Sequence, residues 1–109
     1  MKTDTMIDIA EMRSNATAAA ELLKAMSNEN RLLILCHLGG QELSVTEINQ
    51  YIDLSQSSLS QHLARLRHDG LVKTRRESQT IYYSIASQSV VNLIGFLQEE
   101  FCSDSSNSC

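Results

Sequence analysis

Apolar side chains recur every three or four residues along most of the chain, which is the spacing of amphipathic helices. The first such stretch covers residues 14–27 and the second covers residues 29–38, with Asn28 placed to cap the second helix. Gly39 and Gly40 follow and are expected to end it. The pattern therefore predicts two consecutive helices in the first part of the chain.

Two more helices follow, and both have recognisable N-terminal signals. After a short extended link, Ser44 and Glu47 match the capping box, in which the two side chains satisfy free backbone N–H groups at the start of a helix. That helix is expected to reach about Tyr51. The next begins at Ser55 and ends before Gly70, and its inward positions are leucines at helical spacing: Leu59, Leu63 and Leu66.

After Gly70 the pattern changes to alternation, which predicts strands. Two strands are expected at 71–76 and 80–85, joined by a short turn at 77–79, and a last helix is expected at 87–101. The predicted order is four helices, a β-hairpin and a final helix, ααααββα. The fold class is therefore mainly α with a β-hairpin wing, the winged helix-turn-helix.

Length and composition indicate that residues 1–109 form a single domain, with flexible ends expected at 1–12 and 103–109. The apolar runs are too short to span a membrane, and the first residues lack the apolar core of a signal peptide. We therefore expect a cytoplasmic protein whose cysteines start reduced. Only 5% of the residues are aromatic, which disfavours a binder of single strands that needs stacking platforms.

The fourth helix has the residue types of a DNA reader. In a helix-turn-helix, the start of the second helix meets base edges in the major groove. Small serines allow close approach, and Gln can pair with two edge atoms of adenine. The candidate base-reading residues are Gln56, Ser57, Ser58, Ser60, Gln61 and His62.

A dense basic patch follows this polar helix face. Residues 56–76 hold five basic residues and one acidic residue, a net charge of +4, and the whole chain carries −4, so the other 88 residues carry −8. This distribution confines phosphate binding to one face of an acidic protein. The alternative is that both features are only solvated surface, which their occurrence together with the hairpin disfavours. The candidate phosphate contacts are Arg65, Arg67, Arg75 and Arg76.

From about Ala19 to Cys102 the chain resembles the ArsR/SmtB family of winged helix-turn-helix regulators. The segments that carry the resemblance are LLKAMSNENRLLILCHL, ELSVTEI, LSQSSLSQHLARLRHDGLV and RRESQTIYYSI. The resemblance implies a homodimer built by the first and last helices, which binds double-stranded DNA at an inverted-repeat operator as a repressor released by an inducer. We expect no cofactor, no membrane partner and no enzymatic activity.

Many members of this family sense metals, and the sequence allows that reading to be tested. One metal site of the family uses cysteines where this chain has Ser44 and Thr46, and hydroxyls are poor ligands for soft metals. The other common site uses Asp, His and Glu on the last helix, where this chain offers only Glu99 and Glu100. We therefore expect no metal site, and a metal- or metalloid-responsive regulator is kept as the alternative.

Cys36 and Cys102 resemble the cysteine pair of the thiol-sensing branch of the family, the HlyU/BigR/SqrR-like regulators. In that branch the corresponding cysteines become linked by a disulfide or polysulfide bridge, and DNA is released. A thiolate attacks an oxidant or persulfide, and a second nearby thiol resolves the product. The resemblance thus implies a small-molecule oxidant or persulfide as inducer, and it assigns no partner to Cys109.

Other readings stay open at this point. Cys36 lies on an apolar helix face, where a cysteine is often a small core residue, and Glu99 and Glu100 oppose thiolate formation at Cys102. A thiol enzyme is disfavoured because the chain has no C-x-x-C pair and no Gly-rich phosphate loop. A winged helix used only for protein contacts is a further alternative. A regulator of this kind either represses directly or activates by displacing another repressor.

Overall fold

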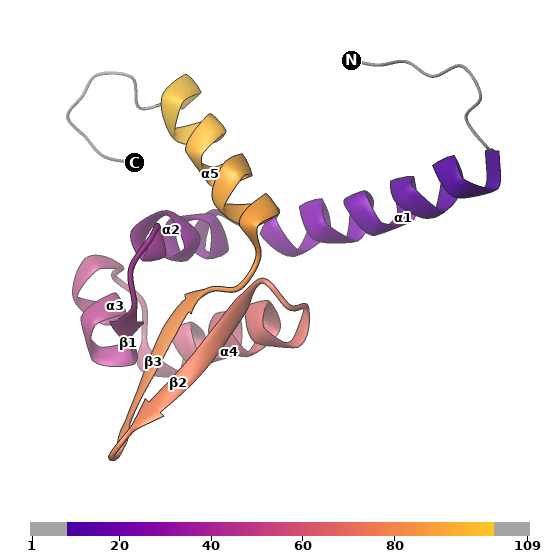
Figure 1. The fold of residues 1–109 in the computed structure, drawn as a ribbon. Helices are drawn as coiled ribbons and strands as arrows, with labels where there is room; N and C mark the ends of the chain where they lie inside the picture. Colours follow the sequence, from indigo (N-terminus) through magenta and orange to yellow (C-terminus); the bar gives the residue numbers. More distant parts are fainter. Residues whose placement is uncertain (1–8, 102–109) are drawn as a thin grey trace.

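The structure is a computed structural model that describes residues 9–101. Its element order confirms the predicted winged helix-turn-helix, with one additional short strand before the third helix. Figure 1 shows the helices around a small twisted sheet whose hairpin projects from the body. The elements are α1 (Ile9–Met26), α2 (Glu29–Leu38), β1 (Leu43–Ser44), α3 (Val45–Tyr51), α4 (Gln56–His68), β2 (Val72–Glu77), β3 (Thr80–Ile85) and α5 (Gln88–Phe101).

Local capping signals define the boundaries of α2 and α3 as the sequence predicted. The Asn28 side chain accepts hydrogen bonds from the backbone N–H groups of Asn30 and Arg31 at the start of α2. The Ser44 hydroxyl accepts from the Glu47 N–H at 3.2 Å, and the Glu47 carboxylate accepts from the Ser44 N–H at 2.8 Å. This reciprocal capping box satisfies two backbone donors that would otherwise lack partners in the helix.

The sheet has three antiparallel strands in the order β1-β3-β2. The predicted hairpin pairs Val72 with Ile85 at its base and Glu77 with Thr80 at its tip. The turn between the strands contains Ser78 with a φ of 61°, a left-handed conformation that a non-glycine residue rarely adopts. The third strand was predicted only as an extended link, and it pairs with β3 through two residues.

A single apolar core lies where α2, α3, α4, the base of the hairpin and α5 meet. The three inward leucines predicted on α4 are all fully or almost fully buried. Burying such side chains stabilises the fold by about 1.5–3 kcal/mol each. The largest fully buried side chains are Ile34, Leu35, Leu38, Ile48, Leu59, Leu63, Leu66 and Val90.

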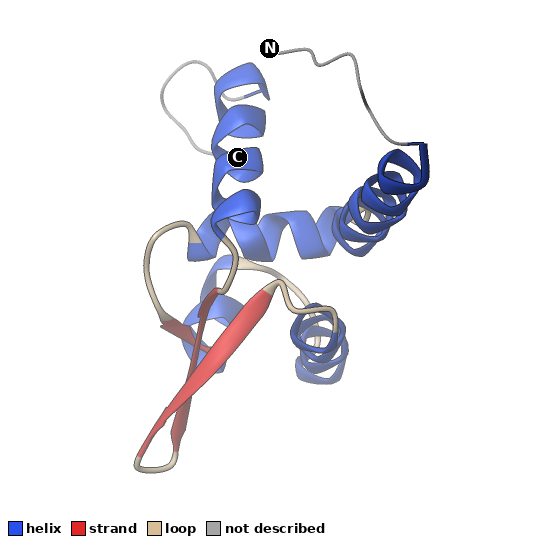
Figure 2. Ribbon diagram, turned by 45° about the vertical axis from the view of Figure 1, so that its right-hand side comes forward, coloured by secondary structure: helices blue, strands red, loops and turns tan. Residues whose placement is uncertain are grey.

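The first helix is longer than predicted and contributes little to this core. It begins at Ile9 and not near Ser14, and among its residues only Ala25 and Met26 are buried. Figures 1 and 2 show α1 and α5 extending away from the hairpin. Neither helix is long and apolar enough to cross a membrane, and the same holds for every helix between residues 9 and 101. Large apolar side chains that stay exposed on the two helices are Ile9, Met12, Leu23, Phe96 and Phe101.

Candidate DNA-binding surface and cysteine site

The turn between α3 and α4 is fixed by an asparagine that the sequence analysis did not single out. The Asn49 side-chain amide donates to the carbonyl of Ile52 at 3.2 Å and to the carbonyl of Leu54 at 3.0 Å. Ser55 then caps α4 by accepting from the Ser58 N–H at 3.1 Å. These bonds satisfy the backbone groups of an irregular turn, so the orientation of α4 relative to α3 is well defined.

The polar residues of α4 divide into two groups. Gln56, Ser57, Ser60 and Gln61 are exposed on the outer face of the helix, opposite the buried leucines. Ser58 and His62 are half-buried, one helical turn apart on the flank of the same helix. Burial, together with the charge of Arg31, lowers the pKa of His62, so its neutral form is favoured near neutral pH.

The four candidate phosphate contacts also differ from one another. The Arg65 guanidinium donates to Asp69 at 2.7 Å across one turn of α4. Arg76 donates to the carbonyl of Ser78 at 3.2 Å in the turn of the wing. Arg67 is exposed and makes no ion pair with the described part of the chain. Arg67 and Arg76 therefore keep an uncompensated charge toward solvent.

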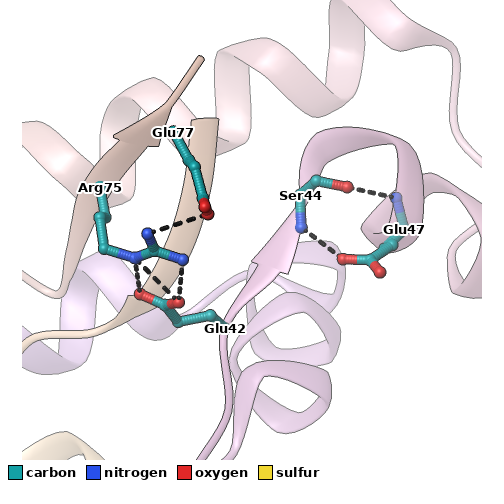
Figure 3. A network of polar contacts seen from close by, with 5 residues as sticks. All are labelled: Glu42, Ser44, Glu47, Arg75 and Glu77. Carbon is teal, nitrogen blue, oxygen red and sulfur yellow. Dashed lines mark hydrogen bonds and ion pairs between the residues drawn. The ribbon is translucent and has the colours of Figure 1, made fainter. Parts of the chain in front are cut away.

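Arg75 is held by two carboxylates (Figure 3). Its Nε lies 3.1 and 3.0 Å from the two carboxylate oxygens of Glu42, and its Nη2 lies 2.8 Å from Oε1 of the same residue. Its Nη1 donates to Glu77 at 3.2 Å, and its guanidinium lies over the Tyr82 ring at 4.9 Å from the centroid. The two carboxylates raise the pKa of Arg75, and Arg75 in turn lowers the pKa of Glu42.

Charge is unevenly distributed over the fold. The basic segment from Gln56 to Arg76 forms α4 and most of β2, and these two elements are in contact. Helix α5 carries Glu99 and Glu100 near its end and no basic residue, whereas α1 carries two acidic and two basic residues. The end of α5 lies far from the wing tip (Figure 1). The reading helix and the wing therefore form the basic side of an acidic molecule.

Cys36 lies on α2 and faces α5. Its side chain is half-buried and lies next to the side chain of Gln98 on α5. Burial raises the pKa of the Cys36 thiol, and the neighbouring Gln98 side chain partly offsets this effect. The predicted second thiol, Cys102, lies outside the described residues, as does Cys109. Among residues 9–101, no group of three or more His, Cys, Asp or Glu side chains is arranged to hold a metal ion.

A helix-turn-helix with an exposed polar reading helix, followed by a basic β-hairpin, defines a winged helix-turn-helix DNA-binding protein. The family model of bacterial regulatory proteins of the arsR family matches residues 28–74, which run from the cap of α2 into the wing. Together with the relatives described next, this match shows that the chain belongs to the ArsR family. The protein is a DNA-binding transcriptional regulator and not an enzyme.

Known relatives resemble nearly the whole chain. The transcriptional activator HlyU of Vibrio cholerae is 51% identical over 96 residues, which cover 88% of this chain and 89% of that protein. A biofilm growth-associated repressor of Agrobacterium fabrum is 39% identical over 101 residues, which cover 93% of this chain and 86% of that protein. The structure of reduced HlyU from Vibrio cholerae superimposes with a TM-score of 0.81 at 53% identity, covering 84% of this chain and 97% of that one.

Proposed function

We propose that this regulator acts as a homodimer on an inverted-repeat operator and that linking Cys36 to Cys102 lowers its affinity for DNA. The observation that supports the switch is the half-buried Cys36 thiol at the contact between α2 and α5. A new covalent link there would shift α5 relative to the domain that carries α4. The direct action is repression, and the alternative is activation by displacement of another repressor, since similar proteins include an activator and a repressor.

In this proposal the outer face of α4 reads the bases. Ser57, Ser60 and Gln61 enter the major groove directly, because they are exposed near the start of the helix. Gln56 lies at the first position of the helix, and Ser58 and His62 approach the groove wall from the flank. Gln61 is the residue best suited to a bidentate contact with adenine.

Arg67 and Arg76 are the proposed phosphate contacts, because each presents a charge that no carboxylate in the described residues neutralises. Arg65 contributes as well, because among the described residues only its Nε donates to Asp69 and its two other nitrogens remain available to a phosphate. Phosphate contacts set affinity and its dependence on salt, whereas the α4 side chains set sequence preference.

The proposed dimer buries the apolar side chains that α1 and α5 leave exposed. Leu23 is 54% exposed, Phe96 is 56% exposed and Phe101 is 80% exposed in the single chain. Large apolar residues gathered on two protruding helices mark a surface for association. A twofold dimer places two copies of α4 in successive half-sites, which matches an inverted repeat.

The proposed chemistry links the two sulfurs in either of two ways. The Cys36 thiolate attacks a peroxide to give a sulfenic acid and hydroxide, and the Cys102 thiolate then displaces a second hydroxide to form a disulfide. Alternatively, each thiolate takes the outer sulfur of a small persulfide and releases the donor's thiolate. The two protein persulfides then condense to a trisulfide and release hydrogen sulfide. In the sequence, Cys102 stands four residues after Gln98 and directly after the last described residue of α5.

The test combines intact mass spectrometry with measured DNA affinity after treatment with glutathione persulfide or with hydrogen peroxide. We expect a Cys36–Cys102 link and loss of operator binding in the wild type, and neither effect in Cys36→Ser or Cys102→Ser. Cys109→Ser is the matched control and should respond like the wild type. A protein that keeps full DNA affinity after both reagents, with no link between the two sulfurs, would refute the switch.

A further inference from the structure

We infer that Arg75 and Glu42 form a brace across the sheet that holds the wing in its DNA-binding position, so that Arg75 is a positioning residue and not a phosphate contact. The inference rests on DNA binding alone and is independent of the cysteine switch. Its basis is the geometry of one guanidinium that reaches across all three strands of the sheet.

The strand register explains how one side chain can reach so far. Arg75 on β2 is paired with Tyr82 on β3, and Tyr82 is paired with Ser44 on β1. The Arg75 guanidinium passes over the Tyr82 ring, which binds its positive charge through a cation–π contact. It then meets Glu42, the residue directly before β1, with two of its nitrogens on the carboxylate. Figure 3 shows the contact between Arg75 and Glu42 from close by.

The surroundings of Arg75 do not favour a phosphate. Each of its three nitrogens already donates to a carboxylate oxygen, from Glu42 or from Glu77. A phosphate at the same place would have to displace these acceptors and would lie beside two negative charges. Lys73 lies on the same side of β2 as Arg75 and Glu77. The positive charges of Lys73 and Arg75 are thus balanced by the two carboxylates that surround Arg75.

The wing needs a brace because its lateral support is short. The strand β1 pairs with β3 through only two residues, whereas the hairpin extends six residues per strand and projects from the body (Figure 2). The Arg75–Glu42 pair adds a side-chain link next to this short ladder. A planar guanidinium bound in the two-pronged manner also restricts orientation, which a single point charge does not.

The brace joins the wing to the end of α2. Glu42 follows the loop of Gly39, Gly40 and Gln41, and the backbone of Gly39 has a φ of 45° that strongly favours glycine. The Gly39 N–H donates to Leu35 and the Gln41 N–H donates to Leu38, so the loop is fixed to the helix. The loop and the brace therefore fix the position of the wing relative to α2, and α2 packs against α4 in the core.

The test measures operator affinity over a series of salt concentrations for Arg75→Gln, Arg75→Lys, Glu42→Gln and the exchange Glu42→Arg/Arg75→Glu. A brace predicts that all three single variants lose affinity by roughly five- to tenfold, since each breaks the same pair. It predicts an unchanged salt slope, because no phosphate contact is lost. The exchange should recover most of the affinity, since it restores the pair with reversed charges.

Arg76→Gln is the matched control, since it removes a neighbouring charge on the same strand and should flatten the salt slope by roughly one unit. Three results would overturn the brace: a gain of affinity in Glu42→Gln, a wild-type affinity in Arg75→Lys, or a salt slope that falls by one in Arg75→Gln. Each would identify Arg75 as a phosphate contact that Glu42 restrains. Wild-type affinity in all variants would also reject the brace. Circular dichroism of each variant checks that the fold is intact.

Discussion

The side chain of Gln98 on α5 lies next to the thiol of Cys36 on α2. This contact joins a helix of the DNA-binding core to one of the two helices that extend from it. Burial raises the pKa of the thiol and is the larger effect, whereas the neighbouring Gln98 side chain lowers it. The reactivity of Cys36 therefore depends on how closely α5 packs against α2.

Replacing Gln98 by Met should slow the reaction of Cys36 with iodoacetamide. Methionine fills a similar volume but donates no hydrogen bond, so the thiol stays buried and its pKa rises further. A smaller thiolate fraction at pH 7.5 should reduce the rate by roughly two- to fivefold, and the rates should converge at high pH. The measurement is alkylation followed by mass spectrometry in a Cys102→Ser/Cys109→Ser background. Gln88→Met on the same helix is the control, and faster alkylation in Gln98→Met would contradict the expectation.

Replacing Gln61 by Ala should reduce discrimination among DNA sequences more than it reduces affinity for random DNA. An exposed glutamine on the reading helix contributes to base recognition, and each good bidentate pair contributes about 1–3 kcal/mol of discrimination. Replacing Arg67 by Gln should instead weaken binding to all duplexes alike and flatten the salt slope by roughly one unit. Fluorescence anisotropy with operator and random duplexes separates the two effects. An equal loss on both duplexes for both variants would reject this division of roles.

Replacing Ser44 by Ala should lower the stability of the whole domain by about 1 kcal/mol, because the capping box of α3 loses its hydroxyl acceptor. For a domain of this size that corresponds to a decrease of roughly 4–8 °C in the melting temperature. Differential scanning calorimetry gives the value directly. Thr46→Ala, two residues later and exposed, is a matched control that should melt close to the wild type.

Replacing Phe96 by Ser should shift the protein from dimer to monomer without unfolding it. Phe96 is 56% exposed in the single chain, so its loss leaves the core intact but removes apolar surface from the proposed dimer contact. Sedimentation velocity over a range of concentrations measures the shift. Tyr51→Ser is the control, because Tyr51 is a similarly exposed aromatic residue, at 58%, on α3. An unchanged dimer in Phe96→Ser would place the interface elsewhere.

The features that the sequence predicted best are those that depend on neighbouring residues. The capping box of Ser44 and Glu47 requires only four consecutive positions, and Gly70 adopts the left-handed φ of 80° that suits the end of a helix. The buried leucines of α4 follow from helical spacing alone. The sequence pattern placed the start of α1 too late, because the first turn of this helix buries no side chain in the core.

Contacts between distant segments could not be predicted from the pattern of the sequence. Glu42 and Arg75 are separated by 33 positions, and nothing in either local sequence indicates the other as its partner. The pairing of β1 was missed because a strand of two residues shows no alternation. The same limit applied to the contact of Cys36 with Gln98, since only the packing of α5 on α2 brings the two together.

The separation of charge between the basic segment 56–76 and the acidic end of α5 gives the molecule an electric dipole. Such a dipole turns in the field of DNA before any atoms touch, so that α4 and the wing face the duplex on arrival. The acidic end of α5 is at the same time directed away from the phosphates. The orientation of the first encounter is thus encoded in where the chain carries its charges, and ionic strength controls how often an encounter succeeds.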